Sequence, residues 1–141
     1  VRSYGGELTL GGRKDFNRMH VAWSGTAARR NIEKISAQGV VDQVPYIANY
    51  QWDSKVTWSW RDWMVRTTIQ GESSRYVDPS TTLIPYTTCS LHVAKNWRWK
   101  NQRLETSFAW NNVTFTEYQT IVGYATPQTA LDVTLSWHLS P

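Results

Sequence analysis

The sequence has no long apolar run and only one cysteine. A helical membrane protein needs about 18 or more consecutive apolar residues, so that class is excluded. Cys89 has no second cysteine with which to form an internal disulfide, and a zinc site would lack its usual cysteine ligands. Residues 1–10 show no charged segment followed by an apolar core, so we expect the chain to begin as a mature protein or within a longer one.

Residues that carry catalysis are also scarce. His20, His92 and His138 are predicted on the polar faces of different strands, and no serine, cysteine or carboxylate stands at a spacing typical of an activated nucleophile. Three strands can bring three histidines to one metal ion, but ordinary polar-face histidines are the simpler interpretation. We therefore expect no enzyme activity, no catalytic residues, no cofactor and no metal site.

No part of the chain is dominated by charge of one sign. Fifteen Lys and Arg residues against eleven Asp and Glu residues give a net charge of +4, and the basic residues are spread along the sequence, often among neutral ones. A nucleic-acid partner usually requires a concentrated basic patch or stripe, so we expect none here.

Tryptophan is abundant, with nine in 141 residues. The segment VPYIANYQWDSKVTWSW, residues 44–60, shows how they are arranged. Its even positions from Tyr46 onward are mainly aromatic or aliphatic, and its odd positions from Asn49 onward are polar. This period of two predicts a strand with one apolar and one polar face.

The same alternation recurs along the chain. Strands are predicted at 4–10, 19–24, 44–60, 63–70, 87–93, 103–110 and 131–139. The short connections are expected at 12–16, 61–62 and 96–101, and the long ones at 25–43, 71–85 and 111–128. No helix is required, although residues 27–35 can form a helical turn within their loop. The sequence therefore predicts an all-β fold, an antiparallel meander of about seven strands.

Alternating short and long connections place all tight turns at one end of the sheet. Outer-membrane β-barrels have this arrangement, with apolar side chains outward and polar ones toward the lumen. Six tryptophans are expected at the tight-turn end, where they would form a membrane-interface ring: Trp58, Trp60, Trp63, Trp97, Trp99 and Trp137. A soluble β-sandwich or small closed barrel with one dry face is the alternative that the periodicity leaves open.

Several short motifs also occur in a characteristic order. They are Gly6-Glu7-Leu8, Ser74-Arg75-Tyr76-Val77-Asp78, Tyr86-Thr87-Thr88, Asn112-Val113-Thr114-Phe115-Thr116-Glu117-Tyr118 and Gly123-Tyr124-Ala125-Thr126-Pro127. Together they resemble the C-terminal barrel strands of TonB-dependent outer-membrane receptors over nearly the whole chain. The departures are Pro127-Gln128-Thr129 in place of the family's Pro-Gly-Arg, and a terminal aromatic, Trp137, that is displaced inward.

The resemblance implies that residues 1–141 are the C-terminal portion of a transmembrane β-barrel in the bacterial outer membrane. By comparison with the family, the plug domain and the N-terminal strands would be absent. Seven strands are fewer than the eight of the smallest barrels, so the chain would be a fragment or would pair its edges with another chain. The implied partners are the lipid bilayer and lipopolysaccharide, the remaining barrel strands, the plug domain, and the TonB system acting through the plug. The implied function is uptake of a small-molecule ligand such as a siderophore, haem, cobalamin or glycan.

Ligand-contacting residues are expected in the long loops, because cations and aromatic rings suit anionic chelates and ring-bearing ligands. The candidates are Arg29, Arg30, Arg75, Tyr76, Tyr118 and Tyr124. Solvated loop positions and lipopolysaccharide contacts are the simpler interpretation of each. Charged residues of the polar face are expected to pair with one another or with the plug: Asp53, Lys55, Arg66, Arg103, Glu105 and Asp132. The alternative function is that of a soluble all-β ligand-binding module, lipocalin-like or carbohydrate-binding.

Overall fold

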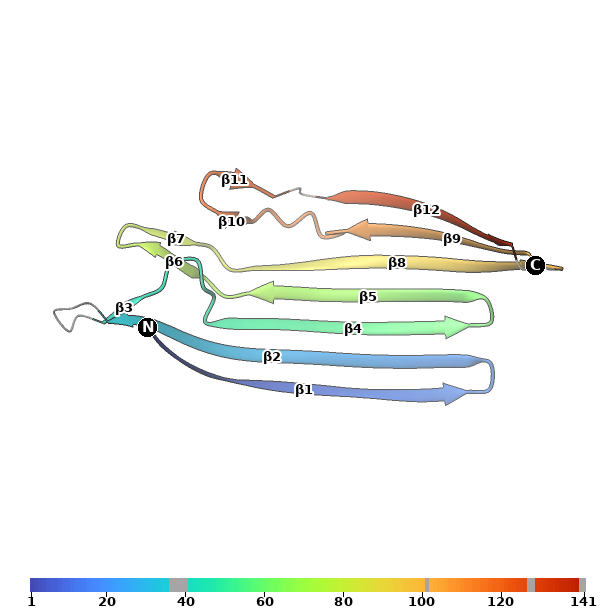
Figure 1. Ribbon diagram of the computed structural model, residues 1–141, viewed down its shortest axis with the longest axis horizontal. Helices are drawn as coiled ribbons and strands as arrows, with labels where there is room; N and C mark the ends of the chain where they lie inside the picture. Colours follow the sequence, from blue (N-terminus) through green and yellow to red (C-terminus); the bar gives the residue numbers. More distant parts are fainter. Residues whose placement is uncertain (36–40, 101, 127–128, 140–141) are drawn as a thin grey trace.

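Seven long strands form one antiparallel sheet through which the chain runs as a meander (Figure 1). The computed structural model describes residues 1–35, 41–100, 102–126 and 129–139, and no helix occurs in those ranges. The strands are β1 (Arg2–Phe16), β2 (Met19–Ile35), β4 (Tyr50–Trp60), β5 (Trp63–Glu72), β8 (Tyr86–Trp99), β9 (Gln102–Asn111) and β12 (Ala130–Leu139). The predicted all-β meander is confirmed.

The tight turns that join long strands all lie at one end of the sheet, as the sequence predicts (Figure 1). The first residues of the three turns are Asn17, Arg61 and Lys100, with φ angles of 49°, 53° and 51°. Left-handed backbone at this position is typical of two-residue hairpin turns, whose twist matches that of the flanking strands. Asn101, at the third turn, lies outside the described residues.

The first hairpin is longer than the sequence predicts. Residues 12–16 belong to β1 and residues 25–35 to β2, so the turn expected at 12–16 and the loop expected to begin at residue 25 are both wrong. Residues 27–35, where the sequence allows a helical turn, are extended instead. The reason is pairing: β1 matches β2 residue for residue from Arg2–Glu33 to Phe16–Met19. This long antiparallel ladder outweighs the local preference of the AARRNIEKI segment. Residues 36–40 of the same connection lie outside the described residues.

The other boundaries also move. Residues 44–49 precede β4 rather than belong to it, and residues 96–99 extend β8 instead of forming a turn. The long connections contain short strands of their own: β3 (Val41–Gln43), β6 (Arg75–Asp78), β7 (Thr81–Leu83), β10 (Gln119–Ile121) and β11 (Tyr124–Ala125). β3 extends the sheet beside β2, while β6 pairs with β7 and β10 with β11. Residues 127–128, expected in the last long loop, are outside the described ranges.

Register is continuous across the seven strands, so apolar residues gather on one face and polar residues on the other. A row across the apolar face consists of Val21, Trp58, Val65, Val93, Phe108 and Val133, with Lys14 of β1 at its edge. The next row, on the opposite face, consists of Ala22, Thr57, Arg66, His92, Ala109 and Asp132. Neighbouring residues of a strand point to opposite faces. A slip of one residue in any strand pairing would therefore mix the apolar row with the polar row.

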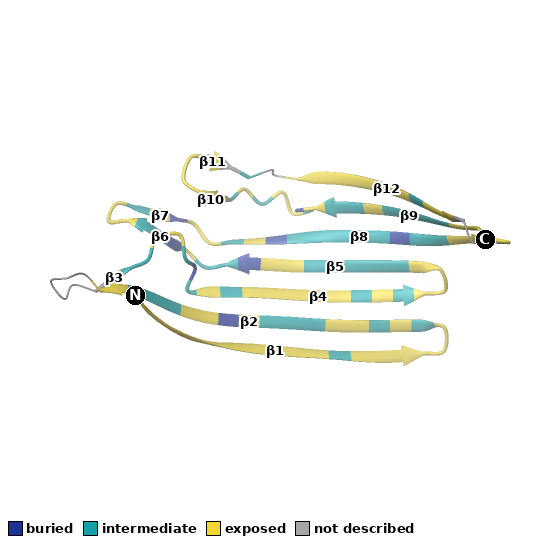
Figure 2. Ribbon diagram, viewed as in Figure 1, coloured by how far each residue is buried: buried dark blue, intermediate teal, exposed yellow. Residues whose placement is uncertain are grey.

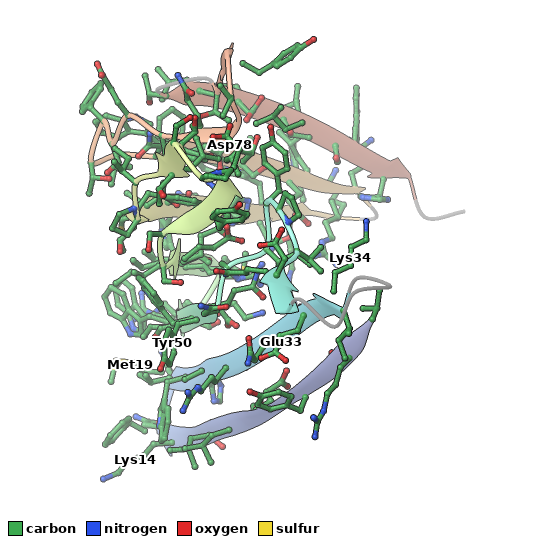
Figure 3. The ribbon with its side chains drawn as sticks, turned by 90° about the vertical axis from the view of Figure 1, so that its left-hand side faces the viewer. Lys14, Met19, Glu33, Lys34, Tyr50 and Asp78 are labelled. Atoms are coloured by element: carbon green, nitrogen blue, oxygen red, sulfur yellow. The ribbon has the colours of Figure 1, made fainter. Side chains whose placement is uncertain are left out.

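All nine tryptophans lie on the apolar face. The strand pairings place Trp23, Trp52, Trp58, Trp60, Trp63, Trp97, Trp99, Trp110 and Trp137 on that face. Figure 3, a view along the strands from the loop end, shows side chains standing on both sides of the ribbon. The polar face thus carries no tryptophan.

The apolar face is the more exposed of the two. Val133 is 81% exposed and Trp137 67%, whereas Thr88 and Ala94 on the polar face are each 3% exposed. Figure 2 shows that the edge strands β1 and β12 are almost entirely exposed, while burial is concentrated in the middle of the sheet and in the loops. No described segment covers the apolar face, and contact of so much apolar surface with water is unfavourable.

Candidate functional site

The long connections gather at the end of the sheet opposite the tight turns (Figure 1). Contacts of Arg75 join them. Arg75 is 4% exposed, and its Nη1 lies 3.3 Å from Glu72 Oε2. Its guanidinium also donates to the backbone carbonyl groups of Gln119 and Thr120, and Ala48 forms a β-bridge with Arg75. The buried guanidinium therefore ties the last long connection to the end of β5, and the backbone of Arg75 joins the connection that precedes β4.

An aromatic pair lies against this cation. The Cζ of Arg75 is 5.5 Å from the ring centroid of Tyr86, and the ring of Tyr86 stacks on Tyr118 with 4.1 Å between centroids and 18° between planes. Gln51 Nε2 donates to the other oxygen of Glu72 at 3.0 Å. The cluster of Glu72, Arg75, Tyr86 and Tyr118, which we call the arginine cluster, fixes the loop end to the strands β5 and β8.

Asn112 organises the start of the last long connection. It is buried with φ of 51°, and its Oδ1 accepts from Thr116 N at 3.1 Å and from Thr114 Oγ1 at 3.0 Å. Thr116 Oγ1 donates to the carbonyl of Thr87 at 2.9 Å. These bonds replace the missing partners of an irregular backbone and hold this loop against β8.

An open hollow of about 420 Å³ lies between the β6–β7 and β10–β11 hairpins. Leu83, Ile84 and Val122 supply its apolar surface, and Thr82, Gln119 and Thr126 its polar groups. Ile84 and Val122 are exposed, whereas Leu83 is buried. Its size and mixed lining suit a small molecule with apolar parts and a few hydrogen-bonding groups.

A second hollow, of about 340 Å³, lies mainly on the polar face near the loop end. Glu7, Asp53 and Glu72 line it together with Arg30 and Gln51. Strand pairing aligns Glu7, Ala28, Gln51, Glu72 and Tyr86 in one row across five strands. This hollow is dominated by carboxylates and amides, so hydroxylated or cationic groups fit it better than anions.

The structure separates the six candidate ligand contacts. Arg29 and Arg30 lie on β2 rather than in a loop, and they point to opposite faces: Arg29 stacks over Tyr50 at 5.5 Å on the apolar face, and Arg30 lines the polar hollow. Placing these two residues in a long loop is therefore wrong, for the pairing reason given above. Tyr118 lines the hollow between the hairpins, whereas Tyr124 is 72% exposed and is not among the residues that line it.

Arg75 and Tyr76 serve mainly internal contacts. The guanidinium of Arg75 is buried in the arginine cluster, and the backbone carbonyl of Tyr76 accepts from Tyr46 N at 2.7 Å. Partial burial, together with the nearby carboxylates of Asp42 and Asp78, raises the pKa of the Tyr76 phenol. Its hydroxyl therefore stays protonated at neutral pH and can donate a hydrogen bond.

The tight-turn end carries the expected aromatic residues. Trp60 pairs with Trp63 across the β4–β5 hairpin, and Leu104 lies between Trp97 and Trp137 in one row. Basic side chains lie over several rings: Arg61 over Trp60 at 5.0 Å, and Lys95 over Trp63 at 4.6 Å and Trp97 at 3.6 Å. All six predicted interface tryptophans are at this end and on the apolar face.

Pairing on the polar face is partial. Arg103 and Glu105 form the expected ion pair at 3.3 Å, Asp132 Oδ2 accepts from Asn111 Nδ2 at 3.1 Å, and Arg66 donates to Thr57 Oγ1 at 3.3 Å.

His20 contacts Asp15 at 2.6 Å. Among the described residues, no group of three or more His, Cys, Asp or Glu side chains can hold a metal ion. No helix in the described ranges is long and apolar enough to cross a membrane.

Sequence reasoning missed Glu72, Tyr86 and Asn112. Glu72 and Tyr86 face each other at the loop ends of β5 and β8. Extending both alternating patterns by two residues would have revealed that pair. Asn112 had a usable signal too, because asparagine tolerates left-handed backbone and often bonds its own loop.

Comparison with known proteins adds no relative. No protein-family model matches the sequence, and no curated protein matches it significantly. The resemblance to TonB-dependent receptors therefore rests on the motifs in the sequence and remains a prediction.

Proposed function

We propose that this chain is a wall segment of an outer-membrane transporter of the TonB-dependent type, with ligand capture at the loop end. The observation that carries the proposal is the placement of all nine tryptophans on the exposed, apolar face of the sheet. In a lipocalin-like module the aromatic residues would line an enclosed cavity, whereas here they stand on the uncovered face.

The dimensions of the apolar face support lipid as its surroundings. On β4 the face runs from Tyr50 to Trp60, which is ten residue steps. At a rise of ~3.3 Å per residue this is ~33 Å of strand, and a tilt of ~40° reduces it to a height of ~25 Å. That height equals the apolar band of outer-membrane barrels. Tyr50 and Trp52 lie at one end of the band and Trp58 and Trp60 at the other, as expected of two aromatic girdles.

The sheet edges support a larger assembly. In the described part of the chain β1 pairs only with β2 and β12 only with β9, so each edge leaves a row of backbone groups without a strand partner. An unpaired edge is not tolerated in hydrocarbon, where no water can satisfy it. The proposal therefore includes further barrel strands that pair with β1 and β12.

Ligand capture is assigned to the loop end. The hollow between the β6–β7 and β10–β11 hairpins is lined by Tyr118, one of the predicted ligand contacts, and Tyr124, another, is exposed on β11. The arginine cluster fixes both hairpins to the sheet, which preorganises the hollow. The polar hollow faces the side that would be the lumen, where a plug domain or a permeating ligand would lie.

Quenching of tryptophan fluorescence by brominated lipid tests the membrane part of the proposal. The chain is reconstituted into vesicles of phosphatidylcholine brominated on the acyl chains, and acrylamide in the aqueous phase serves as the opposing quencher. Because every tryptophan is on the apolar face, we expect strong quenching by bromine and weak quenching by acrylamide. Strong acrylamide quenching with no bromine effect would overturn the proposal and favour the soluble binding module.

A further inference from the structure

Basic residues that are dispersed in the sequence come together at the tight-turn end of the sheet. The segments 12–23, 56–67 and 95–106 extend five residues to either side of the three hairpin turns. They hold nine of the fifteen basic residues and three of the eleven acidic ones, a net charge of +6 against −2 for the rest of the chain. They also hold six of the nine tryptophans. This end is therefore both cationic and aromatic.

Lys95 stands on the apolar face itself. It lies opposite Trp63 in the strand pairing, and its Nζ is 3.6 Å from the ring centroid of Trp97 and 4.6 Å from that of Trp63. Among the described residues no carboxylate pairs with it within 4.0 Å. An ammonium group that lies over two indole rings can still donate hydrogen bonds to a ligand.

An apolar hollow of about 300 Å³ adjoins Lys95. Trp58, Trp60, Trp63, Val65 and Val93 line it. A second hollow, of about 650 Å³, shares Trp58 and Trp60 with the first and is lined by Arg18 and Arg61. The guanidinium of Arg61 lies 5.0 Å over the ring of Trp60. Cations thus flank the apolar hollow on both sides.

We infer that this end of the sheet binds an anionic phospholipid, with an acyl chain in the apolar hollow and the phosphodiester between Lys95 and Arg61. The inference rests on the proposed membrane location and adds the class of lipid and the residues that select it. Cations near a membrane surface attract anionic lipids, and the indole rings place Lys95 and Arg61 at headgroup depth. A soluble phosphate would satisfy the cations but leave the hollow unfilled.

The test compares two brominated lipids as minor components of phosphatidylcholine vesicles. One is brominated phosphatidylglycerol, which is anionic, and the other is brominated phosphatidylcholine at the same fraction. We expect stronger tryptophan quenching by the anionic lipid in the unmodified chain. A cation near the surface contributes ~1 kcal/mol, so Lys95→Gln should lower this preference by about fivefold.

Two variants serve as controls. Lys100→Gln removes one positive charge from the same end, at the hairpin tip and away from the hollow, and should lower the preference by clearly less than Lys95→Gln does. Lys95→Arg should retain the preference, which separates loss of charge from loss of folding. Equal losses in Lys95→Gln and Lys100→Gln would show diffuse attraction and overturn the site.

The remaining outcomes separate the inference from the proposed function. Equal quenching of the unmodified chain by both brominated lipids leaves the membrane location standing and overturns the lipid site. Absence of quenching by either lipid contradicts both. Soluble glycerol phosphate in excess should not reduce the preference for the anionic lipid, and a clear reduction would mean that the cations bind an anion without the acyl chain.

Discussion

The guanidinium of Arg75 lies over the ring of Tyr86, with 5.5 Å between Cζ and the ring centroid, at the point where β5, β8 and the long loops meet. The same guanidinium pairs with Glu72 and donates to two backbone carbonyl groups of the last long connection. These contacts of Arg75 hold the loop end together, because Arg75 is buried and its partners lie up to 45 residues away in the sequence.

Replacement of Arg75 by methionine should therefore loosen the loop end. Glu72 and the carbonyl groups of Gln119 and Thr120 would lose a charged donor, and the loss of a buried, charge-assisted network costs ~3 kcal/mol. We expect faster amide hydrogen exchange and faster proteolysis in residues 112–126, with β4 and β5 unchanged. Arg29→Met is the matched control, since Arg29 also lies 5.5 Å over a tyrosine but is exposed. Equal exchange rates in the two variants would contradict the role assigned to Arg75.

Gly71 is covered by the indole of the residue opposite it in β4. A Cβ at this position would lie 2.5 Å from atoms of the Trp52 ring and 2.5 Å from the backbone carbonyl of Tyr86. Gly71→Ala should therefore displace Trp52 and lower the free energy of unfolding by ~1–3 kcal/mol. The urea unfolding midpoint of the reconstituted chain measures this loss.

Gly6→Ala is the control for that experiment. Gly6 lies in β1, on the same face of the sheet as Gly71, and no atom stands within 4 Å of the position that its Cβ would take. Alanine there should be neutral or stabilising by up to ~1 kcal/mol, because glycine loses more conformational entropy on folding. If Gly71→Ala and Gly6→Ala unfold at the same urea concentration, the position of the Trp52 indole does not depend on the absence of a side chain at Gly71.

The sequence predicts the sheet well because the sheet depends on a signal that is local and repeated. Alternation at 50–60 and 63–70 specifies both strands, both faces and the Arg61–Asp62 turn between them, and the structure confirms each. It fails at 25–35, where the segment is extended because β1 pairs with residues 25–33 on one side, and β4 and β3 pair with residues 25–29 and 33–35 on the other. The sequence of residues 25–35 does not itself alternate between apolar and polar residues, so it does not predict the strand.

The loop end could be predicted only in part, for a similar reason. The sequence identifies Arg75, Tyr76 and Tyr118 as noteworthy, but their environment depends on how three connections pack together. Arg75 is buried because Glu72 and the carbonyl groups of residues 119–120 surround it, and no pattern in SRYVD contains that information. The charge distribution is similar, since the basic residues of three hairpins become neighbours only when the strands pair.

Asp78 should make the β6–β7 hairpin sensitive to acid. Ser80 donates to Asp78 Oδ1 from its hydroxyl at 2.7 Å and from its amide at 2.8 Å, and these bonds lower the pKa of Asp78. Because the folded pKa lies below the unfolded one, the contribution is present at neutral pH and is lost as the pH falls through the folded value. The amide chemical shift of Ser80 should follow that titration, and Asp78→Asn should abolish the acid step. A step that persists in Asp78→Asn belongs to another group.

Ile69 and Gln70 are neighbours on β5 that face opposite sides of the sheet, and they test which side meets lipid. Ile69 lies on the apolar face opposite Ser54, near the middle of the band, and Gln70 lies on the polar face opposite Asp53. If the apolar face is in hydrocarbon, Ile69→Arg should destabilise the reconstituted chain by ~2–4 kcal/mol, the cost of a cation near the bilayer midplane. Gln70→Arg should change stability by less than ~1 kcal/mol, because its side chain can reach water and Asp53.

The same two substitutions also distinguish the membrane wall from a soluble protein. On a sheet whose apolar face is wetted by water, both substitutions are surface changes and should fall within ~0.5 kcal/mol of the unmodified chain. In a soluble barrel with the aromatic face inward, Ile69→Arg would prevent folding in detergent-free buffer, where the unmodified chain should then be soluble and monomeric. A membrane wall requires that Ile69→Arg lower the stability strongly only in the presence of lipid, and that Gln70→Arg leave it nearly unchanged. Only lipid makes the two faces of one strand so different for the same cation.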